Sequence, residues 1–181
     1  KVQAALGITE DVDLSTFNPF ATDNVEAAKQ VEAAAQKIVA IANTVAAAAE
    51  AAGADKDVAL ASAIDTIATE ASSATTTLDL SDTSENGVIN KVITAVNTAT
   101  NTAADASITN AIANINTAID TTVASATTLD DARETFAVAQ STLTEAAIAT
   151  VTGDTYIATQ LGTTSDPTAL KTISSTSISI N

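Results

Sequence analysis

The sequence predicts a mainly α protein, an antiparallel bundle of four to five helices followed by a short C-terminal β-strand segment. Three observations support this prediction. Alanine provides 41 of the 181 residues and fills long stretches in which apolar residues recur at helical spacing. Gly7, Gly53 and Gly153 stand where such stretches end. The last residues alternate apolar and hydroxyl side chains, which is typical of a strand.

Residues 1–22 are expected to form a short apolar turn and then an acidic loop. Gly7 ends the turn as a C-cap, because glycine readily adopts the left-handed conformation found there. Phe17 and Phe20 follow the acidic residues, and we expect both rings to anchor the loop on the helices behind it.

The first long helix is predicted over residues 24–52. Asp23 and Glu26 have the spacing of a capping box, and Gly53 supplies the stop. An apolar stripe with steps of three and four residues marks the expected buried face: Val31, Ala35, Ile38, Ala42, Val45 and Ala49. Because alternate members are alanine, a neighbouring helix can approach closely.

A second helix is predicted over residues 56–73, with Asp55 as its N-cap. Its expected buried face consists of Val58, Ala61, Ile64, Ile67 and Ala68. Three consecutive threonines at 75–77 follow the helix and end it, since β-branched side chains crowd a helix.

Residues 84–126 carry two apolar stripes that do not join. The first consists of Val88, Val92, Val96, Ala99 and Ala103, and the second of Ile108, Ile112, Ile115, Ile119 and Val123. The step between the stripes breaks the helical period, so we predict two helices with a break within 102–107. Asp105 and Ser107 can cap the second of them.

The last long helix is predicted over residues 129–150. Thr128 and Asp131 form a second capping box, and Gly153 ends the helix. Its inner face is expected to contain Leu129, Ala132, Phe136, Ala139, Leu143, Ala146 and Val151.

Residues 154–181 differ in kind from the helical stretches before them. The segment 165–167 has the pattern of a one-turn helix start with proline at the first helical position. Residues 173–180 then partly alternate in the manner of a strand, which could add to a sheet of a following or neighbouring domain. We therefore divide the chain into a helical bundle at 1–153 and an extended tail. The interaction residues expected in this tail are Ile173, Ile178 and Ile180.

The composition excludes several classes of function. Seven Lys and Arg residues against 22 Asp and Glu residues give a net charge of −15, which argues against nucleic acids and anionic membrane surfaces. The absence of His and Cys removes thiol and imidazole chemistry and nearly all zinc and haem sites. The metals left open are those that oxygen ligands bind, calcium or magnesium; no cofactor is certain, and calcium is the candidate. With three Phe and one Tyr, aromatic-lined ligand pockets are not expected. No catalytic motif and no apolar run of membrane-spanning length occurs, and we predict that the protein is not an enzyme.

One segment matches the start of a calcium-binding loop. The ligands it would supply are the side-chain oxygens of Asp82, Ser84 and Asn86 and the carbonyl oxygen of Val88. Gly87 would make the sharp turn, but the twelfth position is Ile93, where a bidentate glutamate is required. Asp82 and Glu85 also have the spacing of a capping box that opens the next helix, and both interpretations stay open.

Acidic residues elsewhere mostly stand at expected helix starts, where carboxylates stabilise the positive end of the helix dipole. The acidic loop near the N-terminus is the exception, because no helix start explains it. Asp11 and Asp13 of this loop are therefore further candidate calcium ligands.

The opening of the chain resembles a helical module of very large bacterial extracellular proteins. The residues that match are Ala4-Ala5-Leu6-Gly7-Ile8 and Asp11-Val12-Asp13-Leu14-Ser15-Thr16-Phe17-Asn18-Pro19, before an Ala-rich helix. In these adhesin-like, S-layer-like and calcium-dependent repeat proteins of marine and soil bacteria, the pattern A-LG…DLTTFDP precedes a helix bundle among β-sandwich modules. The resemblance is concentrated in residues 1–50 and departs at Asn18, where an aspartate is usual. It implies a cell-surface location and a structural or adhesive role, and it supplies no catalytic residues.

We therefore expect a structural or interaction module of a bacterial cell-surface or extracellular assembly, such as an S-layer, adhesin or filament subunit. It would act by scaffolding and by docking to other modules or to copies of itself, as a homopolymer or within a multidomain chain. Because the chain contains no methionine, we expect a processed product or a piece of a longer polypeptide. The alternative is a calcium-responsive binding module of a secreted protein, because a divalent ion would relieve the repulsion among its acidic residues.

Overall fold

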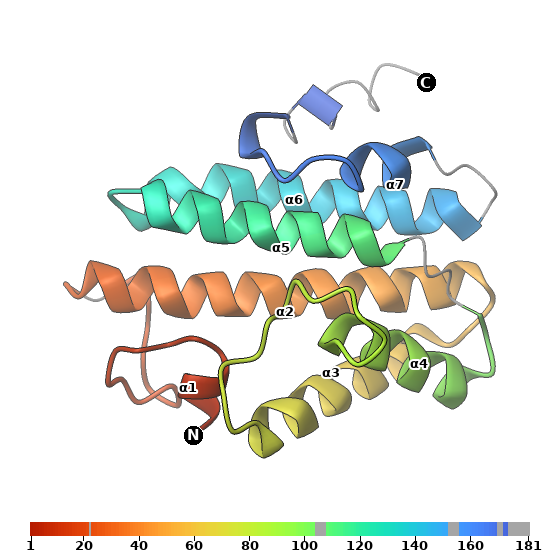
Figure 1. Cartoon of the computed structure of the whole chain (residues 1–181), viewed down its shortest axis with the longest axis horizontal. Coiled ribbons are helices and arrows are strands. Elements are labelled where there is room, and N and C mark those ends of the chain that lie inside the picture. The colour runs from red at the N-terminus through yellow and green to blue at the C-terminus, as the bar shows by residue number, and fades with distance from the viewer. Residues whose placement is uncertain (22, 104–107, 152–155, 170–171, 174–181) are drawn as a thin grey trace.

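A computed structural model describes residues 1–21, 23–103, 108–151, 156–169 and 172–173. Over these residues the protein is mainly helical, as predicted. The long helix α2 runs through the middle of the molecule, with α5 and α6 on one side of it and α3 and α4 on the other (Figure 1). The helices are α1 (Val2–Ala5), α2 (Val25–Ala51), α3 (Lys56–Ser73), α4 (Val88–Thr100), α5 (Ile108–Ser125), α6 (Leu129–Val151) and α7 (Tyr156–Leu161).

Helix α2 forms the centre of the core, because its C-terminal half is buried on nearly every side. Helices α3, α4, α5 and α6 all contact it. Its buried residues are mainly alanines: Ala27, Ala28, Ala33, Ala34, Ala40, Ile41, Ala42, Thr44, Val45, Ala46, Ala47, Ala48 and Ala49. Such short side chains let several helix axes lie close to α2 at once.

The start of α2 lies one residue later than the capping box predicts. Asn24 is the N-cap in place of Asp23, and its Oδ1 accepts a hydrogen bond from the Ala27 N–H at 3.1 Å. The predicted stop is confirmed, since Gly53 follows the helix with a left-handed φ of 94°. The predicted stripe is wrong in part, because Ala35 is exposed and the covered surface is wider than one stripe.

The N-cap of α3 is Asp55, as predicted, but the buried face of this helix is not the predicted one. The residues buried along α3 are Ala59, Ala63, Ile67 and Ala71. A row of residues four apart, with alanine at three positions, brings α3 against α2 and α4. Four apolar residues of the expected face are therefore exposed, and only Ile67 of that face is buried.

The predicted break between two helices is confirmed. Helix α4 ends at Thr100, where Asn101 takes a left-handed φ of 53°, and α5 begins at Ile108. The expected caps of α5, Asp105 and Ser107, lie outside the described residues. The second predicted stripe forms the main aliphatic seam of the core: Ile108, Ile112, Ile115 and Ile119.

The capping box at the start of α6 is confirmed. The Thr128 N–H donates to Asp131 Oδ2 at 2.9 Å, and the Asp131 N–H donates to Thr128 Oγ1 at 3.3 Å. The Thr127 hydroxyl donates to the same carboxylate at 2.8 Å. These hydrogen bonds, that of the Thr127 side chain first and then those of Thr128, lower the pKa of Asp131 below its ordinary value of 3.8.

We expect the substitution Thr127→Val to raise the pKa of Asp131 toward its ordinary value, because it removes the strongest donor to the ionised carboxylate. The folded-state pKa is depressed, so the stabilisation from this cap is present above the unfolded-state pKa. It is lost as the pH falls through the folded-state pKa. A carbon-detected NMR titration of the carboxyl group measures the shift. Thr121→Val, which removes a hydroxyl bonded to the Thr117 carbonyl, should leave the Asp131 titration unchanged.

The C-terminal part of the chain departs from the predicted extended tail. Helix α7 packs on α5 and α6 and buries Ala158 and Leu161. Asn114 Nδ2 on α5 donates to the Leu161 carbonyl at 2.8 Å and fixes the end of this helix. A helical turn at 167–169 agrees with the predicted one-turn start. Six residues are too few to display a helical period, which explains why the sequence pattern did not reveal α7.

The N-terminal loop is held on the bundle by hydrogen bonds rather than by both phenylalanines. Gln30 Oε1 on α2 accepts a hydrogen bond from the Thr9 N–H at 2.9 Å. The Leu78 N–H donates to the Ala5 carbonyl at 2.8 Å and ties α1 to the segment after α3. Phe20 is 60% exposed, so the expectation that it anchors the loop is wrong.

Candidate functional site

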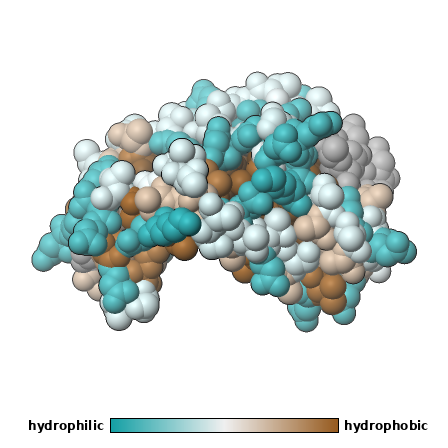
Figure 2. Space-filling view, turned by 60° about the horizontal axis from the view of Figure 1, so that its bottom comes forward, coloured by the Kyte–Doolittle hydropathy of each residue, from teal (hydrophilic) through white to brown (hydrophobic). Residues whose placement is uncertain are grey.

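The side of α3 that faces away from the core carries four exposed apolar residues among the exposed polar residues Asp57, Asp65 and Thr69. The apolar residues are Val58, Ala61, Ile64 and Ala68, which we call the α3 outer face. Val58 is 46% exposed and Ile64 is 43% exposed. Hydrophobic and hydrophilic residues are interspersed on the side of the molecule turned to the viewer in Figure 2.

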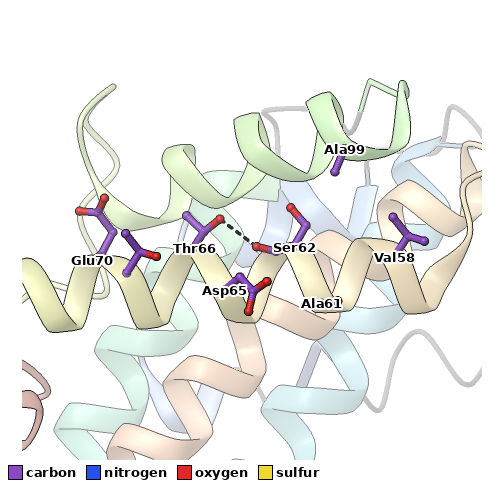
Figure 3. A pocket seen from close by; sticks show the side chains of 8 residues that line it. Val58, Ala61, Ser62, Asp65, Thr66, Glu70 and Ala99 are labelled. Carbon is purple, nitrogen blue, oxygen red and sulfur yellow. Dashed lines mark hydrogen bonds between the residues drawn. The ribbon is translucent and has the colours of Figure 1, made fainter.

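A groove of about 530 Å³ runs between α3 and α4 along one edge of this face (Figure 3). Its lining residues are Val58, Ala61, Ser62, Asp65, Thr66, Thr69, Glu70 and Ala99. The two helices diverge toward the end that carries Val58 and Ala99 (Figure 3). At the other end, the Lys91 ammonium lies 2.7 Å from Glu70 Oε2 and links the helices.

The groove combines hydroxyl groups with small apolar side chains. The Thr66 hydroxyl donates to the Ser62 carbonyl at 2.8 Å, while the Asp65 carboxylate is exposed beside it. The lining residues contain no nucleophile paired with a base, so the groove lacks the arrangement that covalent catalysis needs.

The predicted calcium loop folds as a tight turn. The Asp82 carboxylate accepts hydrogen bonds from the Ser84 N–H at 2.8 Å and from the Ser84 hydroxyl at 2.9 Å. These bonds, the backbone one first, lower the pKa of Asp82. A Cβ at Gly87 would lie 2.4 Å from the Asp82 carbonyl oxygen, so only glycine fits this turn. Asn86 is exposed, and Val88 is buried as the first residue of α4.

The capping box predicted from Asp82 and Glu85 is wrong. The N-cap of α4 is Gly87, and no side chain caps it. Asp82 bonds within the preceding turn, because its carboxylate is used by Ser84 before the helix begins. The turn is held from α5 by Asn116, whose Nδ2 donates to the Leu80 carbonyl at 2.6 Å.

The two candidate ligands in the N-terminal loop are both exposed. Asp13 Oδ1 accepts hydrogen bonds from the Ser15 hydroxyl at 2.6 Å and the Ser15 N–H at 3.0 Å, which lower the pKa of Asp13. Asp11 lies two residues earlier in the same loop. The part of the chain that the structure describes contains no cluster of three or more acidic side chains able to hold a metal ion. Calcium binding stays a prediction, which a thermal melt with calcium against chelator would test.

The predicted interaction residues at the C-terminus lie mostly beyond the described part. Ile173 belongs to a helical turn and packs against the core, so it is not part of an extended strand. Ile178 and Ile180 lie outside the described residues. Within the ranges that the structure describes there is no strand.

Sequence reasoning missed the α3 outer face, although the sequence holds a signal for it. The row Ala59, Ala63, Ile67 and Ala71 has the same helical period as the face that was expected to be buried. The prediction favoured larger side chains, whereas a close helix contact favours small ones. Because the small residues of α3 take the contact with the core, Val58 and Ile64 face outward.

None of the described helices is long and apolar enough to cross a membrane. No protein-family model, no curated protein and no solved structure matches the chain.

Proposed function

We propose that the protein is a structural and interaction module of a bacterial cell-surface or extracellular assembly, an S-layer, adhesin or filament subunit. It acts by scaffolding and by docking to other copies of itself, without catalysis. The observation that carries the proposal is the apolar α3 outer face beside an open groove, on a bundle whose centre is packed with alanine. The resemblance of the opening residues to modules of extracellular proteins supports the location.

The bundle is suited to a scaffolding role because its core is tightly packed around one helix. Alanine seams on α2 and α3 leave short side chains with few rotamers between the helix backbones. The aliphatic residues of α4 and α5 supply the larger apolar burial. Such a block keeps the surfaces on its two sides at a fixed separation.

The occupant that we assign to the α3–α4 groove is the C-terminal segment 174–181 of a second copy. In this segment Ile178 and Ile180 alternate with serines, which matches a groove lined by apolar and hydroxyl groups. Helix α7 packs on α5 and α6, on the side of α2 opposite to α3 and α4 (Figure 1). A contact between two different surfaces of one chain is heterologous, and repetition of that contact builds a filament.

Two variants test this assignment by removing one half of the contact each. Deletion of residues 174–181 removes the tail, and Val58→Asp places a charge in the groove. We expect each variant to remain folded by circular dichroism and monomeric by size-exclusion chromatography with light scattering, where the parent chain polymerises. A mixture of the two should form dimers and nothing larger. The tail of the Val58→Asp chain can bind the groove of the shortened chain, and the pair then has no intact tail or groove left.

The matched control is Val39→Asp, which charges a 37% exposed valine on α2 that is not among the groove residues. This variant should polymerise like the parent chain. Assembly that survives the deletion or Val58→Asp would overturn the proposed contact. A parent chain that stays monomeric at every concentration would overturn self-assembly as the function.

A further inference from the structure

A small pocket lies between the N-terminal loop, α2 and α6, away from the α3–α4 groove. Its volume is about 310 Å³. The residues that line it are Phe20, Glu32, Gln36, Arg133, Phe136, Ala137 and Gln140. Aromatic residues make up 2% of the chain, yet two of them meet here together with its single arginine.

The Phe20 ring is held at the mouth of the pocket without being buried. It is 60% exposed, and its backbone N–H donates to Asn18 Oδ1 at 2.9 Å, which fixes the turn that presents it. The guanidinium carbon of Arg133 lies 5.3 Å from the ring centroid, a cation–π contact. Arg133 Nη1 also lies 3.2 Å from Asp130 Oδ1. These contacts bring the ring and the guanidinium together at the mouth of the pocket.

Polar groups along the side of the pocket form a chain that leaves two acceptors open. Gln140 Nε2 donates to the Gln36 carbonyl at 2.9 Å and to Gln36 Oε1 at 3.3 Å. Gln36 Nε2 in turn donates to Glu32 Oε1 at 2.7 Å. The second oxygen of Glu32 and the side-chain oxygen of Gln140 accept no hydrogen bond from the residues that the structure describes. The pocket therefore offers acceptors on α2 and α6, and donors on Arg133.

The charges in and around the pocket favour a neutral ligand. An anion would approach a protein of net charge −15 and a pocket that contains Glu32, while Arg133 is already paired with Asp130. A cation would be attracted by the net charge of −15 and by Glu32, but within the pocket it would meet the Arg133 guanidinium, which already lies over the Phe20 ring. A hydroxylated ring avoids both penalties, because each hydroxyl is at once a donor and an acceptor. Its C–H face can also lie on the face of Phe20 that the Arg133 guanidinium does not cover.

We propose that this pocket binds one or two units of a neutral carbohydrate, stacked on Phe20 and hydrogen-bonded to Glu32, Gln140 and Arg133. The volume lies at the lower end of the range for small-molecule sites, about 300–1,000 Å³, which suits a ligand of that size. The proposal does not rest on the assembly through α3, because the two sites share no lining residue.

The experiment titrates the full chain with cellobiose, maltose and N,N′-diacetylchitobiose, observed by NMR shifts of the Gln36 and Gln140 side-chain amides and by calorimetry. We expect at least one of these sugars to bind with a dissociation constant of about 1 mM and to shift both amides. Benzoate serves as the anionic aromatic probe and should not bind. Failure of all three sugars to bind, or binding of benzoate alone, would overturn the proposal.

Three variants separate the pocket from non-specific binding. Phe20→Ala should weaken binding by more than about tenfold, and Phe20→Tyr should retain it, because tyrosine keeps the aromatic face. Leu14→Ala changes another exposed apolar residue of the same loop that does not line the pocket, and it should bind like the parent chain. Melting curves confirm that each variant is folded. Unchanged sugar binding in Phe20→Ala would show that the ring is not the platform.

Discussion

Replacing Ile115 with alanine should lower the free energy of unfolding by about 2–5 kcal/mol. Ile115 is completely buried in the aliphatic seam of α5. The substitution removes apolar surface from the core and leaves a cavity among the buried residues. A domain has a total stability of about 5–15 kcal/mol, so one such loss is a large fraction of it.

Urea unfolding followed by far-ultraviolet circular dichroism measures this loss. The matched control is Ile148→Ala on α6, which deletes the same atoms from a side chain that is 48% exposed. Its free energy of unfolding should change by no more than about 0.5 kcal/mol. Equal losses in the two variants would contradict the position of the α5 seam inside the core.

An increase in side-chain size at the centre of α2 should also be destabilising. We expect Ala46→Leu to lower the free energy of unfolding by about 1–3 kcal/mol. Ala46 has no exposed surface, and helices pack on α2 from both sides, so the added carbons have no space to enter. Leucine has nearly the helix propensity of alanine, and the change therefore reports on packing alone.

Ala35→Leu is the control for this second prediction, because Ala35 is an exposed alanine in the interior of the same helix. Its urea midpoint should stay close to that of the parent chain. If Ala46→Leu unfolded at the same midpoint as Ala35→Leu, the packing around α2 would be looser than the burial of its alanines indicates.

The ends of the helices could largely be predicted because they depend on neighbouring residues. Asp55 caps α3, and Thr128 and Asp131 cap α6, through hydrogen bonds that span three residues or fewer. The error at the start of α2 has a local cause as well, since Asp23 and Asn24 are adjacent and both residue types cap helices well. Only the geometry of the turn decides which of the two is used.

The buried faces of the helices were harder to predict, because alanine is nearly neutral between core and surface. On α3, the small residues face the core and Val58 and Ile64 face outward, which hydrophobicity alone does not favour. On α2, a single stripe was expected, whereas helices on both sides cover most of the C-terminal half. In both helices, the buried face depends on which other helices pack against it, and the tertiary structure sets that packing.

The pocket at Phe20 could not be predicted for a related reason. Phe20 and Arg133 are far apart in the sequence, and their contact forms only when the N-terminal loop lies across α6. Each residue seen alone has an ordinary interpretation, an anchoring ring and a solvated charge. Their combination with Gln36 and Gln140 becomes visible only in the folded chain.

The central position of α2 has a mechanical consequence. Helices α3 and α4 contact each other on one side of α2, and α5 and α6 contact each other on the opposite side. If α2 detached from the bundle, the inner surfaces of both helix pairs would become exposed to water at the same time. We therefore expect the bundle to unfold in one cooperative step. Under tension applied to its two ends, such a bundle would hold a constant length up to a threshold force and then extend abruptly.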